Sequence, residues 1–231
     1  IEEFLPMIEE CGIDHFSGTA RCRSPQLRIT PDSPQKARLM DLNLTGKTVL
    51  VTGGSKGIGL ATARAFAAEG AAVTLVARDP ATLAAAAETL RAETGTAPET
   101  VAADLATDAG REALVAARPL PDILVNNAGA IRGGSLEDVS MADWREGWEL
   151  KVFGFIHLCK LWLPPMKRRG SGVIINIIGM GGRSVRPGYI IGAAGNAALI
   201  GFTNALGAEA QKSGVRVFGI NPSPTLTDRM E

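Results

Sequence analysis

The sequence predicts an α/β fold, a doubly wound parallel sheet in a single domain with helices on both faces. Short runs rich in β-branched residues alternate with longer helix-like stretches from Lys47 onward. That alternation is typical of parallel sheets, because each crossover between parallel strands usually runs through a helix. A glycine-rich loop directly follows the first run, and 231 residues are too few for two domains of ordinary size. One domain is therefore expected.

The short runs are expected to form strands, and the stretches between them helices. The strands are predicted at residues 48–52, 72–77, 100–103, 123–126, 173–178 and 215–220. The helices are predicted at residues 57–69, 80–94, 108–117, 140–169 and 190–212. Gly70 suits the end of the first helix and Pro80 the first turn of the second. Pro164 and Pro165 should kink or break the fourth, because proline lacks the N–H group that the helix needs.

Residues 1–40 differ from the rest, because they mix prolines and scattered charges with no sustained helical or strand period. We expect a disordered extension there, followed by a dinucleotide-binding domain over residues 41–231. Cys11, His15 and Cys22 fall in the extension, but they lack a fourth ligand and their spacing matches no familiar zinc site. No metal site is predicted.

The overall charge is balanced, since 24 basic side chains offset 24 acidic ones. That balance does not indicate a nucleic-acid partner or an anionic membrane surface, and a small-molecule partner fits better. The three cysteines are too widely spaced for a disulfide framework, which favours the cytoplasm. The charge-free run from Pro187 to Ala208 is long enough to span a membrane, but its five glycines and two asparagines favour a helix buried in protein or at a subunit interface.

The glycine-rich loop lies where a nucleotide-binding site is expected. It follows the first strand, leads into a helix and contains Gly53, Ser55, Lys56, Gly57, Ile58 and Gly59. Glycines let the backbone approach a pyrophosphate closely, and the start of the helix offers free N–H groups and the positive end of its dipole. The loop therefore predicts dinucleotide binding, although any tight strand-to-helix turn could use the same spacing.

The end of the second strand indicates which dinucleotide is bound. An acidic residue there would select the free 2′-hydroxyl of NAD(H), whereas a cation accommodates the 2′-phosphate of NADP(H). The sequence has Ala77 at the strand end and Arg78 next, with Lys56 as a second cation in the glycine loop. NADP(H) is therefore the predicted cofactor. NAD(H) stays open because Asp79 is close by, and both cations could instead be solvated surface residues.

Together with the glycine loop, three later segments resemble the short-chain dehydrogenase/reductase family, from about Leu42 to the end of the chain. They are Asp104-Leu105, Asn126-Asn127-Ala128-Gly129 and Asn221-Pro222-Ser223-Pro224-Thr225-Leu226-Thr227, the last with Ser223 where the family has glycine. The resemblance implies a Rossmann fold and a cofactor site that includes Asp104, Leu105, Asn126, Ala128, Gly129 and Thr227. Asp104 would lie near the adenine and Thr227 near the nicotinamide amide. Asn126 and Gly129 would lie near the ribose and the central sheet.

The same resemblance implies a catalytic set of a serine, a tyrosine, a lysine four residues after the tyrosine, and an asparagine on an earlier helix. Aligned without gaps, these four positions hold Gly179, Gly192, Asn196 and Lys151 respectively. A general acid–base group is worth about 10²- to 10⁴-fold in rate, so losing the phenol and its activating cation should suppress the usual reaction. The resemblance therefore predicts the fold and the cofactor site, but not the usual mechanism.

Lysine and asparagine have exchanged places in that set, and the only tyrosine of the chain, Tyr189, lies three residues before the expected one. We therefore predict Tyr189 and Lys151 as a substitute acid–base pair. The alternative is that Tyr189 is a packing or surface residue and Lys151 a solvated helix cation. His157, in a largely apolar helix, is expected to be a partly buried structural residue.

Two functions are consistent with these residues. The first is an NADP(H)-dependent oxidoreductase acting on a carbonyl or a secondary alcohol, and the second is a catalytically silent NADP(H)-binding or regulatory protein. The resemblance also implies a homo-oligomer, for which the helix after Pro187 would suit the interface. In that family a further helix and a seventh strand follow the position of Glu231, so we expect a fragment with an incomplete sheet.

Overall fold

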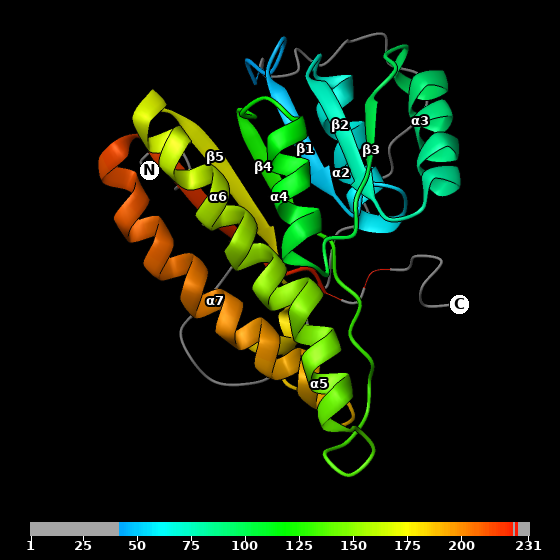
Figure 1. Cartoon of the computed structure of the whole chain (residues 1–231), viewed down its shortest axis with the longest axis vertical. Helices are drawn as coiled ribbons and strands as arrows, with labels where there is room; N and C mark the ends of the chain where they lie inside the picture. Colours follow the sequence, from blue (N-terminus) through cyan, green and yellow to red (C-terminus); the bar gives the residue numbers. More distant parts are fainter. Residues whose placement is uncertain (1–41, 224, 226–231) are drawn as a thin grey trace, which may run out of the picture. The chain divides into compact units, whose positions relative to one another are not determined.

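A computed structural model describes residues 42–223 and 225, and Figure 1 shows their arrangement. These residues form a six-stranded sheet in the order β3-β2-β1-β4-β5-β6, and every neighbouring pair is parallel. The strands are β1 (Thr48–Thr52), β2 (Ala72–Ala77), β3 (Glu99–Ala102), β4 (Ile123–Asn126), β5 (Gly172–Ile177) and β6 (Val215–Ile220). This is the strand order of the Rossmann fold, so the predicted fold class is confirmed. The predicted extension, residues 1–40, lies outside the described residues.

Helices cover both faces of the sheet (Figure 1). They are α2 (Gly57–Ala68), α3 (Pro80–Thr94), α4 (Asp108–Ala117), α5 (Met141–Trp148), α6 (Gly154–Arg169) and α7 (Ile190–Ala210). The described residues also form three short turns: the π turn η2 (Glu149–Phe153) between α5 and α6, and the 3₁₀ turns η3 (Met180–Gly182) before α7 and η4 (Gln211–Ser213) after it. Successive strand residues point to opposite layers, so Val51 packs in the core with α2 and α3, whereas its neighbour Leu50 packs in the core with α4 and α6.

The fourth predicted helix, residues 140–169, differs from the prediction in two ways. It is divided into α5 and α6 by the π turn η2, whose residues include no glycine or proline that would signal an interruption. A break at Pro164 and Pro165 is wrong, because α6 runs through both and ends at Gly170 in the left-handed conformation, with φ 73°. Pro164 is exposed, so the carbonyl group of Lys160, which loses its helical partner, can bond to water.

The charge-free run after Pro187 forms the long helix α7. By length and composition alone, Ile190–Ser213 could cross a membrane, but core helices pass the same test. α7 packs against β6, α5 and η3, and it buries Ile191, Leu199 and Ala210. These contacts pack one face of α7 inside the protein, with about a third of its apolar window (33%) buried, and the predicted subunit interface stays a prediction.

Candidate cofactor and active site

A cleft of about 720 Å³ opens beyond the carboxyl ends of β1, β2 and β4. It lies where the strand order reverses between β1 and β4, the place at which open α/β sheets bind ligands. Most residues predicted for the cofactor site meet on its walls: Gly53, Ser55, Lys56, Gly57, Ile58, Arg78, Leu105, Ala128 and Gly129. The walls also include Ala77, Asp79, Thr82, Ala103, Asn127, Ala130 and Leu150. Thr227 lies outside the described residues.

The glycine loop leaves no room for side chains at two positions. Gly53 has a positive φ of 63°, and a Cβ there would lie 2.9 Å from Nδ2 of Asn127. A Cβ on Gly59 would lie 2.2 Å from the carbonyl oxygen of Gly53. Gly59 is therefore buried behind the loop rather than on the cleft wall, and both positions require glycine.

Asn127 fastens this loop to the end of β4, a role that the sequence analysis missed. Its backbone N–H donates to Oγ1 of Thr52 (2.9 Å). Its Nδ2 donates to the carbonyl groups of Thr52 (3.0 Å) and Gly53 (3.1 Å). The Thr52 hydroxyl in turn donates to the carbonyl group of Val125 (3.2 Å), so the loop and two strands form one hydrogen-bonded unit.

The neighbouring Asn126 points the other way. It is fully buried, and its Nδ2 donates to Oδ1 of Asn176 (2.9 Å), whose Nδ2 donates to the hydroxyl of Thr203 (2.9 Å). The structure therefore places Asn126 in the central sheet beneath α6 and α7, and not on the cleft wall. The alternation of side chains along a strand is the signal that could have distinguished Asn126 from Asn127.

Asp104, which was expected near the adenine, lies between two residues of the cleft wall, Ala103 and Leu105. Its exposed side chain turns back on its own loop, where Oδ1 accepts from the N–H of Ala106 (3.1 Å). The wall at this end of the cleft is therefore apolar, and it suits the face of an aromatic base.

The first turn of α2 meets the cleft without a capping side chain from the described residues. In contrast, α3, α4 and α5 are capped by Asp79, Thr107 and Ser140, whose side chains accept from backbone N–H groups of the first turn. The N-cap residue of α2 is Lys56, a cation. Uncapped N–H groups and the positive end of the helix dipole form an anion-binding end on the cleft wall.

Lys56 and Arg78 are exposed and line the same cleft. Asp79 is the only acid among the described residues of its wall, and its carboxylate accepts from the N–H groups of Thr82 (3.0 Å) and Ala81 (3.3 Å). These two backbone hydrogen bonds, that from Thr82 first, lower the pKa of Asp79. The acid that could select a ribose hydroxyl is therefore used as a helix cap.

Lys151 lies in the π turn η2 and extends toward the end of β5. Its Nζ donates to the carbonyl oxygen of Ile178 (2.5 Å), the residue that follows β5. Its aliphatic part packs over Gly129, where a Cβ would lie 3.0 Å from Cδ of Lys151. The amine therefore reaches the carboxyl ends of β4 and β5, next to the cleft wall at Gly129.

Tyr189 immediately precedes α7, and its ring takes the space that a side chain at position 192 would need. A Cβ on Gly192 would lie 2.0 Å from Cζ and 2.4 Å from Oη of Tyr189. A single β-bridge joins the backbone of Tyr189 to that of Gly134 and so fixes the loop. The ring also packs against an apolar cluster that contains Ile131, Val139 and Ile191.

Gly179 and Asn196 lie beside the same region. Gly179 has a φ of 121°, a conformation that side chains rarely adopt, so a serine there would be strained. Asn196 is buried, and its Nδ2 lies 3.2 Å and 3.3 Å from the Cβ positions of Gly179 and Gly181. The Cβ position of Gly181 also lies 3.2 Å from ring carbons of Tyr189. The structure thus brings Gly179, Tyr189, Gly192 and Asn196 together beyond β5.

Known proteins resemble the chain in both sequence and fold. Residues 47–231 match the protein family described as short chain dehydrogenase. The chain is 34% identical over 189 residues to the 3-oxoacyl-acyl-carrier-protein reductase FabG of Chlamydia trachomatis, covering 80% of this chain and 76% of that protein.

Two solved structures show the same arrangement of strands and helices. One is the L-sorbose reductase from Gluconobacter frateurii complexed with NADPH and L-sorbose, with a TM-score of 0.78, 36% identity and coverage of 82% of this chain and 74% of that one. The other is a short-chain dehydrogenase from Sphingobium yanoikuyae in complex with NADPH, with a TM-score of 0.74, 32% identity and coverage of 79% and 72%.

Proposed function

Because the chain belongs to the short-chain dehydrogenase/reductase family, we propose that it is an NADP(H)-dependent oxidoreductase acting on a carbonyl or a secondary alcohol. The cleft beyond β1, β2 and β4 carries this proposal. It combines glycines that permit close approach, an uncapped helix start and two cations at the point where the strand order reverses. The two similar structures that contain NADPH support the same cofactor.

The residues of the cleft fit the pyrophosphate and the 2′-phosphate of NADP(H). Gly53 lets the backbone approach a pyrophosphate, and Gly59 lets the loop close against the start of α2, whose first turn would bind the pyrophosphate through its N–H groups. Lys56 and Arg78 would pair with the 2′-phosphate, while Asp79 remains the cap of α3. When bound, the cofactor supplies or accepts the hydride, and the protein supplies position and charge.

We infer that Tyr189 and Lys151 act as the acid–base pair. The phenol of Tyr189 would donate a proton to the substrate oxygen during reduction and accept it during oxidation, and the ammonium group of Lys151 would favour the phenolate. The contact with Gly192 supports this role. The ring of Tyr189 occupies the space of a side chain at position 192, so a phenol lies next to the position at which the resemblance expects a tyrosine, although it comes from three residues earlier in the chain. The amine of Lys151 reaches the same edge of the sheet at Ile178.

A catalytically silent NADP(H)-binding protein is the second candidate. It is favoured by the contacts of the same two side chains, because the ring of Tyr189 packs in an apolar cluster and the amine of Lys151 donates to a backbone carbonyl. Both side chains would then be structural. The glycines at positions 179 and 192 would leave that site without its usual hydroxyl groups.

Two measurements separate these candidates: NADPH binding by fluorescence, and NADPH consumption with a panel of ketones and aldehydes. We expect binding with turnover, whereas binding without turnover would support the silent protein. Tyr189→Phe and Lys151→Met should each lower kcat by about 10²-fold. Lys160→Met, which changes an exposed lysine of α6, is the matched control. Unchanged activity in Tyr189→Phe and Lys151→Met would refute the pair.

The choice of cofactor is tested by Arg78→Ala. Losing a hydrogen bond between charged groups should weaken NADPH binding by about 10- to 100-fold and leave NADH binding nearly unchanged. Arg168→Ala, at an exposed arginine in the last turn of α6, controls for the loss of one surface cation. An equal loss of affinity for both dinucleotides would overturn the assignment.

A further inference from the structure

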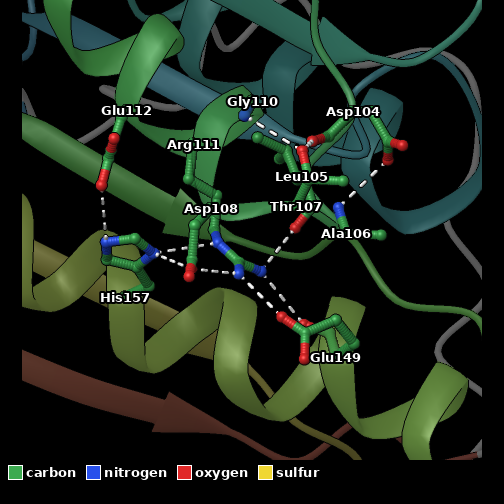
Figure 2. Close-up of polar contacts among 10 residues, drawn as sticks. All are labelled: Asp104, Leu105, Ala106, Thr107, Asp108, Gly110, Arg111, Glu112, Glu149 and His157. Carbon is green, nitrogen blue, oxygen red and sulfur yellow. Dashed lines mark hydrogen bonds and ion pairs between the residues drawn. The ribbon is translucent and has the colours of Figure 1, made fainter.

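Arg111 of α4 is a buried arginine whose five N–H donors are all paired (Figure 2). Its side chain is only 1% exposed, which is rare for arginine. Nε donates to Nδ1 of His157 (3.1 Å), and Nη1 donates to the carbonyl groups of Leu105 (2.8 Å) and Glu149 (3.2 Å). Nη2 donates to the carboxylates of Asp108 (2.6 Å) and Glu149 (2.8 Å). These contacts use every donor of the guanidinium group.

Acidic side chains compensate the buried charge. Asp108 lies 2.7 Å from Nδ1 of His157 as well, so the carboxylate, the imidazole and the guanidinium form one compact cluster. The hydrogen bond from Arg111 is the main cause that lowers the pKa of Asp108. His157 belongs to this structural cluster and is 18% exposed, in agreement with the sequence prediction. Since a buried charge is costly without its partners, the cluster is held as a unit.

Through Nη1, Arg111 joins two walls of the cofactor cleft. Leu105, whose carbonyl group accepts one hydrogen bond, lines the cleft after β3. Glu149, whose carbonyl group accepts the other, begins the π turn η2, and the next residue, Leu150, also lines the cleft. Lys151 follows directly. One nitrogen atom therefore ties the loop after β3 to the turn that carries Lys151.

The π turn determines the direction in which Lys151 extends. A π turn adds one residue to a helical turn, and such turns are frequent at functional sites. Because each residue of an α-helix advances by about 100° around the axis, the extra residue rotates the side chains that follow relative to α5. The carbonyl group of Glu149 already accepts the N–H of Gly154 across this turn, and Arg111 supplies it with a second donor.

We propose that Arg111 is a positioning residue. By bonding to Glu149 it fixes the π turn, and it thereby directs the amine of Lys151 to the carbonyl group of Ile178 at the end of β5. The inference rests on the proposed catalytic role of Lys151. Arg111 is not on the cleft wall, so its influence is on the position and reactivity of the Lys151 amine.

Competitive acetylation of the lysines, followed by mass spectrometry, tests this position without requiring activity. Arg111→Lys keeps the charge but cannot reproduce the planar set of five donors. We expect Lys151 to be acetylated about fivefold faster than in the wild type, the factor that corresponds to the loss of one typical hydrogen bond. The exposed Lys160 of α6 is the internal reference, and its rate should stay constant. An unchanged rate at Lys151 in folded Arg111→Lys protein would overturn the proposal.

Glu149→Gln gives a second test if Arg111→Lys does not fold, because it keeps the size of the side chain and weakens the bond that holds Nη2 of Arg111 beside the π turn. Activity then separates this proposal from the proposed function. Faster acetylation with a lower kcat and an unchanged KM supports both. Faster acetylation with an unchanged kcat supports the positioning role and refutes the catalytic role of Lys151. A lower melting temperature with unchanged acetylation would mean that Arg111 only stabilises the fold, which contradicts the proposal.

Discussion

Two regions of the molecule use glycine in different ways. After β1, the backbone of the glycine loop leaves no room for a side chain at position 59, because a Cβ there would lie 2.2 Å from the carbonyl oxygen of Gly53. After β5, the ring of Tyr189 leaves no room for a side chain at position 192, because a Cβ there would lie 2.0 Å from that ring. Both arrangements make room for another part of the chain, the first for a carbonyl group of the glycine loop and the second for an aromatic ring. A glycine therefore indicates close approach, and only its neighbours show what approaches.

The largest effect is expected from Gly59→Ala. The added methyl group must displace the carbonyl group of Gly53 or the amide of Asn127, which lies 2.5 Å from the Cβ position, and so distorts the loop. NADPH affinity should fall by about 100-fold or more, equivalent to about 2.7 kcal/mol, measured by fluorescence titration. Gly201→Ala is the matched control, because a Cβ there meets nothing within 4 Å. Wild-type affinity in Gly59→Ala would mean that the loop does not bind the cofactor.

Gly192→Ala should affect the region after β5 and leave the region after β1 unchanged. Its methyl group cannot coexist with the observed ring of Tyr189, so the phenol must move, while the glycine loop is untouched. We expect kcat to fall by about 10²-fold, as for the loss of an acid–base group, with an NADPH dissociation constant that stays close to the wild-type value. Steady-state kinetics beside fluorescence titration measures both. If kcat is unchanged, the observed position of Tyr189 does not matter for the reaction.

The sequence predicts the first region better than the second. The boundaries of β1, β2, β4 and β6 agree with the prediction, because apolar runs between glycines and charges mark strands well. Most of the glycine-loop residues meet on the cleft wall for the same reason, since local spacing alone fixes a strand-loop-helix turn. Asn127 was missed because two adjacent asparagines look alike until the strand assigns them to opposite faces.

The second region depends on contacts between distant parts of the chain. The π turn at Glu149 is supported by Arg111, 38 residues earlier, and its own residues give no local signal. Likewise, Tyr189 is held by a bridge to Gly134, and its ring lies over a residue one turn into the next helix. Sequence spacing could place Tyr189 and Lys151 in this region, but it could not give the direction of either side chain.

Two buried threonines give a matched test of stability in the two regions. The Thr52 hydroxyl accepts from the N–H groups of Asn127 and Ala128, whereas the Thr203 hydroxyl accepts from Nδ2 of Asn176. Each change to valine leaves donors unpaired, partly buried ones at Asn127 and Ala128 and a buried one at Asn176, and should lower the free energy of unfolding by about 1–3 kcal/mol. Only Thr52→Val should also weaken NADPH binding. Denaturant unfolding measures the loss of stability, and fluorescence titration measures the affinity for NADPH. An equal loss of affinity in Thr203→Val would contradict the expectation that only the region after β1 binds the cofactor.

The smallest effect is expected at Cys159. Its Sγ lies 3.5 Å from Nδ2 of Asn126, at the end of β4, the strand between the two regions. Burial raises the pKa of the Cys159 thiol to about 12. The folded protein therefore keeps this proton at a pH where the unfolded chain, with a thiol pKa of about 8.5, releases it. The stabilisation is fully present below the unfolded pKa and is lost as the pH rises toward the folded value.

Between pH 9 and pH 10 the free energy of unfolding should consequently fall by about 1 kcal/mol more in the wild type than in Cys159→Ala. Denaturant unfolding at the two pH values measures the difference, and the comparison with Cys159→Ala cancels the groups that titrate equally in both proteins. This difference would show that Cys159 is shielded from water, as the core residues on either side of it are. Equal pH slopes in the two proteins would show instead that water reaches Cys159, and that the two regions are separated by a hydrated layer.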